Sequence, residues 1–185
     1  MDYAAKFADG LSYKRFLERY GSADQRSRWN EFHASVRLSA AQVELLKSFT
    51  REMKILVLAG TWCGDCVNQC PIFERFAEQT STLKIHYFDR DENPDLAAEV
   101  QTCGGARVPT LVFLSEDGYV CGRYGDRTLS KYRSVVQSTV GNACSTGLNV
   151  DDDLTAAVVQ DWLDEFERIQ WMLRTSARLR KLHGD

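Results

Sequence analysis

Apolar residues recur at helical spacing through the first fifty positions. Two segments open with a capping box, at Ser22 and Ser39, each followed three residues later by Gln. The apolar residues that share a face after these caps are Trp29, Phe32 and Val36 in the first segment and Val43, Leu45, Leu46 and Phe49 in the second. An apolar stripe upstream predicts a further short helix that ends at Gly21. We therefore expect an N-terminal helical extension over residues 1–52.

From residue 53 the pattern changes to short apolar runs. Residues 54–60, KILVLAG, form a continuous run that is typical of a strand buried on both faces. Residues 64–79 have helical periodicity and residues 83–88 predict a second strand, which a helical crossover makes parallel to the first. The other elements predicted here are a helix at 93–101, a β-hairpin at 110–114 and 119–124, a helix at 128–139 and a loop to about residue 149.

Residues 141–185 are predicted to be this loop followed by one long amphipathic helix at 151–182. Its apolar residues at helical spacing are Leu154, Val158, Trp162, Phe166, Ile169, Leu173 and Leu179. Acidic residues crowd its start and basic residues its end, which complements the helix dipole. Such an apolar face must be covered, on the domain or on a partner. We expect it to pack on the chain's own N-terminal helices, with a homodimer as the alternative.

Composition narrows the class of protein. The chain has 185 residues, of which 44% are hydrophobic and 26% charged, so a disordered chain is excluded. The net charge of -3 provides no basic surface for nucleic acid, and no apolar run has the length that a membrane span requires. The first residues do not have the pattern of a signal peptide, so we expect a cytoplasmic protein. In that compartment the six cysteines are expected to be free, catalytic or metal-bound.

Two of these cysteines form a motif that carries chemistry, Trp62-Cys63-Gly64-Asp65-Cys66. The motif follows a buried strand and opens a helix, so Cys63 is expected at the helix N-terminus, where unpaired N–H groups stabilise a thiolate. Cys66 is close enough to attack a mixed disulfide on Cys63 and release the bound partner. A zinc site is the other use of this spacing, but zinc requires four ligands and no second Cys or His pair follows, so no metal is expected.

The motif and its surroundings resemble the thioredoxin family. The features that carry the resemblance are the strand before WCGDC, Pro71, Asp91, Pro94, Val108-Pro109-Thr110, Gly118 and Gly125. Together they cover about residues 53–140 and imply a thioredoxin-like α/β fold, a mixed sheet of about four strands flanked by helices.

The resemblance also implies a set of site residues. Cys63 would be the nucleophile and Cys66 the resolving thiol. Pro109 would be cis beside the disulfide, with the backbone of Val108 pairing with bound substrate. Trp62, Gly64 and Asp65 complete the substrate-binding surface. No bound cofactor is implied, but an external electron donor is, either a reductase or a low-molecular-weight thiol.

The chain departs from the family pattern at several positions. Asp65 stands where the family usually has proline, and its carboxylate is expected to oppose a thiolate on Cys63. Val57 aligns with a buried acid of many thioredoxins and Tyr87 with its accompanying lysine, so no carboxylate at position 57 can relay a proton. The stretch 101–107 is longer than usual. The WCGDC form with an N-terminal helical extension is similar to a bacterial subgroup of thioredoxin-like proteins.

Two functions are consistent with this pattern. The first is a thiol–disulfide oxidoreductase that acts on a disulfide-containing protein or small-thiol substrate. The alternative is a redox-silent binding module that uses the helices at 1–50 and 151–182 to contact a protein. The intact CxxC favours the enzyme. Oligomeric state, monomer or homodimer, stays open.

The remaining cysteines are not assigned to the reaction. Cys70 is expected four residues after Cys66 on one helix, too far for an unstrained bridge, and is interpreted as a bystander. Cys121 and Cys144 have no spaced partner. Cys103 lies in a Gly-rich loop before Pro109. Two interpretations stay open for it: a regulatory or second-disulfide role, and no role in the chemistry.

Overall fold

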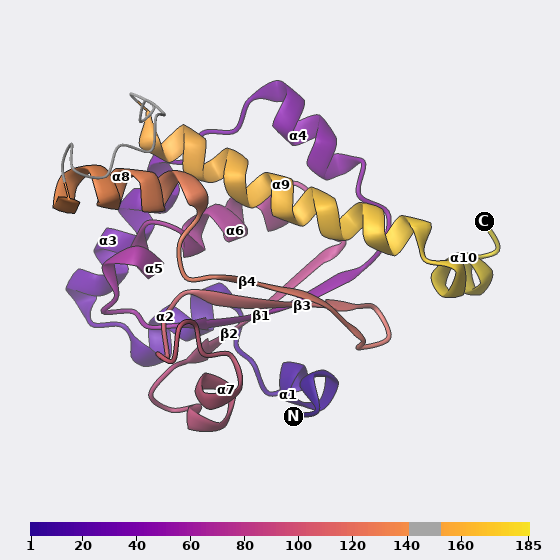
Figure 1. Ribbon diagram of the computed structural model, residues 1–185, viewed down its shortest axis with the longest axis horizontal. Coiled ribbons are helices and arrows are strands. Elements are labelled where there is room, and N and C mark those ends of the chain that lie inside the picture. Colours follow the sequence, from indigo (N-terminus) through magenta and orange to yellow (C-terminus); the bar gives the residue numbers. More distant parts are fainter. Residues whose placement is uncertain (141–152) are drawn as a thin grey trace.

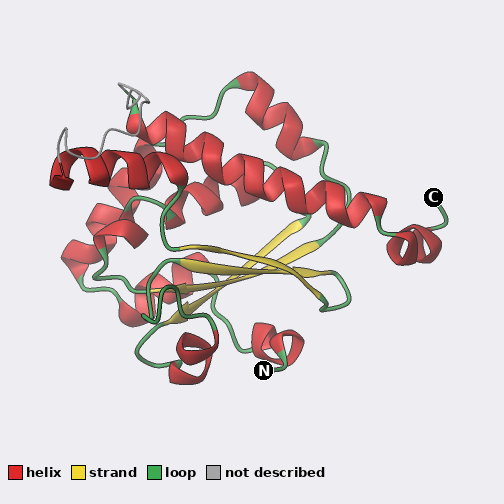
Figure 2. Cartoon of the chain, in the orientation of Figure 1, coloured by secondary structure: helices red, strands yellow, loops and turns green. Residues whose placement is uncertain are grey.

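A computed structural model describes residues 1–140 and 153–185 and shows one twisted sheet with helices on both sides (Figures 1 and 2). The strands are β1 (Met53–Ala59), β2 (Leu83–Asp89), β3 (Thr110–Ser115) and β4 (Val120–Gly125). Their order across the sheet is β2-β1-β3-β4, with β1 parallel to β2 and antiparallel to β3, and β4 antiparallel to β3. The mixed sheet of about four strands that the family resemblance implies is confirmed.

The centre of the sheet is buried on both faces. Six of the seven β1 residues are buried, and so is every residue of β3, because helices cover the sheet from above and below in the view of Figure 1. This explains the continuous apolar run at 54–60, since a strand that faced water on one side would alternate apolar with polar residues. The edge strand β4 is partly exposed along its whole length.

The N-terminal extension is helical, as expected. It comprises α1 (Tyr3–Ala8), α2 (Tyr13–Tyr20), α3 (Ala23–Ser35) and α4 (Ala40–Lys47). Both capping boxes form, at Ser22 and Ser39, each with reciprocal hydrogen bonds to its Gln. Before Gly21 there are two helices rather than the one predicted. Between them, the backbone N–H and C=O of Leu11 pair with Tyr87, at 3.0 and 2.7 Å, and so cover the free edge of β2.

The helix predicted at 64–79 is broken into α5 (Gly64–Val67) and α6 (Cys70–Ala77). The break lies at Gln69, whose φ of -129° and ψ of -46° leave the helical region. Pro71 stands in the first turn of α6, where its missing N–H costs nothing. The two later helices, α7 (Pro94–Glu99) and α8 (Leu129–Val140), lie where the sequence predicts them. The loop predicted to about residue 149 falls mostly outside the described residues.

The long C-terminal helix is α9 (Leu154–Thr175), and its predicted apolar stripe is buried from Val158 to Leu173, whereas Leu154 is only partly buried. The ring of Trp162 lies 4.6 Å from Phe73 of α6 and 5.0 Å from Tyr124 of β4. Phe166 lies 5.3 Å from both Phe76 and Phe113. The helix therefore packs on α6 and the sheet. The expectation that the N-terminal helices are its main partner is wrong, and no second copy is needed to cover these rings.

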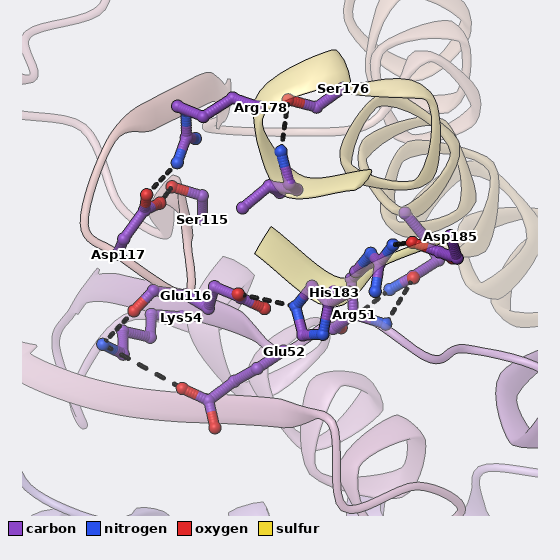
Figure 3. A network of polar contacts seen from close by, with 12 residues as sticks. Arg51, Glu52, Lys54, Ser115, Glu116, Asp117, Ser176, Arg178, His183 and Asp185 are labelled. Atoms are coloured by element: carbon purple, nitrogen blue, oxygen red, sulfur yellow. Dashed lines mark hydrogen bonds and ion pairs between the residues drawn. The ribbon is translucent and has the colours of Figure 1, made fainter. Parts of the chain in front are cut away.

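The helix predicted to continue to residue 182 ends at Thr175, and a separate helix, α10 (Ala177–His183), follows. Ser176 has φ -64° and ψ 115°, and its side chain caps α10. Figure 3 shows how α10 docks: Arg178 pairs with Asp117 on the β3–β4 turn, and His183 Nε2 lies 2.7 Å from Glu116. None of the helices within 1–140 and 153–185 is both long and apolar enough to cross a membrane.

Because α9 closes the core, truncating a buried ring on it should cost stability. Phe166→Ala should lower the free energy of unfolding by about 3–5 kcal/mol, the usual cost of removing a buried phenylalanine. Urea denaturation followed by circular dichroism measures this. Trp171→Ala, on the exposed face of the same helix, is the matched control and should change stability by less than about 0.5 kcal/mol. Equal small losses for both variants would contradict this packing.

Candidate active site

The WCGDC motif lies where the sequence predicts it, after the end of β1 and across the start of α5. Cys63 is the N-cap of α5, with an extended backbone at φ -79° and ψ 124°, and its side chain caps no backbone group. Its carbonyl accepts the N–H of Val67 at 3.0 Å, which begins the helix. The Cys63 thiol is half-buried, whereas Cys66, inside the helix, is completely buried. Of the two thiols, only Cys63 can meet a partner molecule.

The loop that contains Val108 and Pro109 enters the neighbouring strand β3 at the same end of the sheet. The Val108–Pro109 peptide bond is cis, and β3 begins directly after it. Cys63 Sγ lies 3.6 Å from the carbonyl oxygen of Val108. The structure therefore brings together Cys63, Cys66, Val108 and Pro109, although 45 residues separate the first from the third.

Gly125, at the end of β4, allows this loop to lie close to the sheet. Its φ is +139°, a conformation that side chains rarely adopt. A Cβ at this position would lie 2.5 Å from the carbonyl oxygen of Pro109. Only glycine fits against the proline loop here, which gives a physical reason for one of the residues that carry the family resemblance.

The two thiols influence each other's ionisation. A hydrogen bond shared with Cys66, followed by burial, raises the pKa of Cys63 above its ordinary value, although backbone N–H groups of Cys66 and Asp65 act in the opposite direction. Burial raises the pKa of Cys66 well above its ordinary value. The stabilising effect of the helix N-terminus is present, as predicted, but the proximity of the second thiol and desolvation outweigh it.

The carboxylate of Asp65 does not face Cys63 as an uncompensated charge. Arg127, two residues after β4, donates to Asp65 Oδ2 from Nε at 2.8 Å and from Nη2 at 2.7 Å. The hydrogen bond from Arg127 to Asp65 raises the pKa of the guanidinium. The sequence-based view of Asp65 as an unpaired repulsive charge therefore needs correction. Sequence reasoning missed Arg127, because no local motif marks a partner that lies 62 residues away.

The surface around Cys63 is open to a substrate. Trp62 is 44% exposed, and the guanidinium of Arg90 lies over its ring, 4.4 Å from the centroid. A Cβ placed on Gly64 would meet no atom within 4 Å, so space beside the thiol is free. Behind this surface, the indole N–H of Trp29 donates to the Thr61 carbonyl at 3.0 Å. The N-terminal extension thus holds the loop that precedes the motif.

Cys70 is not on one continuous helix with Cys66, so the spacing argument that made it a bystander is wrong. The break at Gln69 makes Cys70 the first residue of α6. Cys70 is buried, and after burial of Cys66 itself the neighbouring Cys70 thiol also raises the pKa of Cys66.

The other cysteines lie away from these contacts. Cys103 is exposed on a turn with a positive φ of 51°, Cys121 is half-buried, and Cys144 falls outside the described residues. Within the described part of the chain, no three His, Cys, Asp or Glu side chains gather as a metal site would require.

Comparison with known proteins identifies the family. The family model described as thioredoxin matches residues 10–138, well over half of the chain. The chain belongs to the thioredoxin family. Thioredoxin-2 of Saccharomyces cerevisiae is 31% identical over 75 residues, which are 40% of this chain and 69% of the yeast protein. Thioredoxin Asp f 29 of Aspergillus fumigatus is 33% identical over 64 residues, 34% of this chain and 56% of that protein.

Two solved structures resemble most of this chain, including its helical additions. A Pseudomonas aeruginosa protein of unknown function superimposes with a TM-score of 0.72 at 18% identity, covering 91% of this chain and 98% of its own. An HIV epitope-scaffold superimposes with a TM-score of 0.65 at 17% identity, covering 88% of this chain and 98% of its own. At these identities the likeness concerns the fold alone. It includes the extensions, since both matches span most of this thioredoxin-family chain.

The raised thiol pKa values predict a strong pH dependence of reactivity. Only the thiolate reacts, so the rate of iodoacetamide alkylation of Cys63 should increase roughly tenfold per pH unit from pH 7 to 8. Because Cys66 is completely buried, Cys63 should be labelled first. Alkylation that is quenched after timed intervals and followed by peptide mass analysis measures the labelling rates of Cys63 and Cys66. A rate that is already constant across this range, or faster labelling of Cys66, would contradict the assignment.

The Asp65–Arg127 pair predicts two substitutions with opposite effects. Asp65→Asn removes a negative charge and frees the guanidinium, so the pKa of Cys63 should fall. Arg127→Gln leaves the carboxylate unpaired, so the same pKa should rise. The pH profile of alkylation measures both shifts, and the double variant should lie between them. Arg123→Gln, which removes a cation from β4 outside this pair, is the control. Shifts of equal sign in the two single variants would contradict the electrostatic role of the pair.

Proposed function

We propose that this protein is a thiol–disulfide oxidoreductase in which Cys63 and Cys66 alternate between a dithiol and a disulfide. The observation that carries the proposal is the position of Cys63: a half-buried thiol 3.6 Å from the Val108 carbonyl, with Cys66 buried behind it. Membership of the thioredoxin family supports a general disulfide chemistry. The residues that perform it here are our assignment.

The reaction proceeds in two exchange steps. The Cys63 thiolate attacks one sulfur of the substrate disulfide, a new S–S bond joins the two molecules, and the other substrate sulfur leaves as a thiolate. Cys66 then loses its proton and attacks Cys63 Sγ, which releases the second substrate sulfur. The substrate gains two electrons and two protons, and the protein is left with a Cys63–Cys66 disulfide. An external thiol or reductase must return the two electrons.

The surroundings of the dithiol suit an extended substrate. The carbonyl of Val108 accepts from the Cys63 thiol at 3.6 Å, so a substrate strand that displaces this contact can form backbone hydrogen bonds beside the thiol, as β-strand addition does elsewhere. Trp62, next to Cys63 in the chain, offers an exposed apolar surface, and the absence of a side chain on Gly64 leaves open space. A disulfide in an exposed protein segment or in a small thiol compound can enter this site.

The proton of Cys66 has no carboxylate acceptor on β1. Val57 is buried where a carboxylate would be needed, and the Tyr87 hydroxyl already donates to the Cys70 carbonyl at 3.3 Å. The leaving substrate thiolate is then the base that accepts this proton. Resolution should therefore be slower than in a site with a buried acid.

Insulin reduction with dithiothreitol tests the proposal. The parent protein should accelerate insulin precipitation, Cys63→Ser should reduce the rate to the background, and Cys66→Ser should accumulate a mixed disulfide that non-reducing electrophoresis detects. Cys121→Ser is the matched control and should behave like the parent. Full activity of Cys63→Ser would refute the assignment. A parent protein that forms no internal disulfide would instead support a redox-silent binding module.

A further inference from the structure

We infer that the buried amide of Gln69 positions the active-site turn and makes the C-terminal helix α9 part of the redox site. The inference rests on the proposed function, because it assigns a positioning residue to the same dithiol. Gln69 is completely buried, and each of its side-chain polar atoms has a partner. These partners come from three segments that are far apart in the sequence.

The first contact replaces a missing helical hydrogen bond. In a continuous helix the backbone N–H of Gln69 would donate to the Asp65 carbonyl, four residues earlier. Because α5 ends at Val67, this N–H turns to the Cys66 carbonyl instead, at 3.3 Å. The side-chain Nε2 of Gln69 donates to the Asp65 carbonyl at 3.2 Å. The short helix that holds both cysteines is thus completed by a side chain.

The other two contacts tie this turn to the rest of the molecule. Nε2 also donates to the carbonyl of Asp126 at 3.1 Å, in the segment after β4. Oε1 accepts the indole N–H of Trp162 on α9 at 3.0 Å. The ring of Trp162 is itself fixed by edge-to-face contacts with Phe73 and Tyr124. The amide therefore has no freedom to rotate without losing a buried hydrogen bond.

This arrangement acts on the thiol from two directions. The backbone N–H groups of Asp65 and Cys66 favour the Cys63 thiolate, and Gln69 holds the turn that carries both of them. Asp126 precedes Arg127, which neutralises the Asp65 side chain. Loss of the Gln69 hydrogen bonds should misalign both the backbone N–H groups beside Cys63 and the Arg127–Asp65 ion pair. The thiolate would lose stabilisation, and the disulfide, whose reduced form is then less stable, would become a weaker oxidant.

Two substitutions test this role. Trp162→Phe keeps a ring on α9 but removes the donor to Oε1, and Gln69→Met keeps the volume but removes all three side-chain hydrogen bonds. Both should slow alkylation of reduced Cys63 at pH 7 by about threefold or more, the effect of about one lost hydrogen bond. Both should also shift the equilibrium constant with glutathione by a similar factor, toward the protein disulfide. Phe166→Leu, a packing change one helical turn away, is the control and should reduce stability alone.

Each outcome has a distinct meaning. Rates and equilibrium constants equal to the parent in both variants would overturn the inference, and so would an equal shift in Phe166→Leu. If Gln69→Met fails to fold, Trp162→Phe decides alone. Failure of the proposed function would appear differently, as a parent protein without a Cys63–Cys66 disulfide, and the alkylation rates of the reduced protein would still report whether Gln69 positions the thiol.

Discussion

The antiparallel pairing of β1 with β3 is the constraint on which the site depends. Its register sets Leu58 opposite Thr110, so the segment leaving β1 and the segment entering β3 meet at the same end of the sheet. The first carries Cys63 and the second carries Val108 and Pro109. A slip of one residue would move every side chain of the shifted strand to the opposite face of the sheet and break the packing on both faces. Packing of the core therefore also fixes the distance between thiol and carbonyl.

The two helical extensions serve the site as well as the core. At the N-terminus, Leu11 covers the edge of β2 and Trp29 holds the Thr61 carbonyl just before the motif. At the C-terminus, α9 covers α6 and the sheet, and Trp162 reaches the amide of Gln69. The N-terminal extension therefore contacts the residue before the motif, and α9 contacts the residue that ends its turn. A minimal core of one sheet and its helices would have neither contact. We interpret the extensions as supports of the dithiol rather than as a separate binding module.

Features set by neighbouring residues could be predicted from the sequence. The capping boxes at Ser22 and Ser39, the buried strands and the N-cap position of Cys63 all depend on residues within a few positions of each other. Features set by distant residues could not. The amphipathic pattern of α9 shows that one face is buried, but the face it meets is chosen by the whole fold. The pairing of Arg127 with Asp65 likewise has no local signal.

The break after α5 depends on neighbouring and on distant residues together, which is why the sequence does not predict it. A proline at position 71 indicates a disturbed helix, but the place of the break depends on Gln69. The amide of Gln69 finds its hydrogen-bond partners only because Asp126 and Trp162 lie beside it in the fold. The position of Cys70, as the first residue of α6 and near enough to raise the pKa of Cys66, follows from that break.

The central claim is that Cys63 and Cys66 form the redox pair, and disulfide mapping tests it most directly. The protein is equilibrated with oxidised and reduced glutathione, quenched with acid, alkylated and digested, and the linked peptides are identified by mass. The account predicts one reversible disulfide, between Cys63 and Cys66, that disappears as the share of reduced glutathione rises. A bridge between Cys66 and Cys70, or no internal disulfide at any ratio, would contradict it.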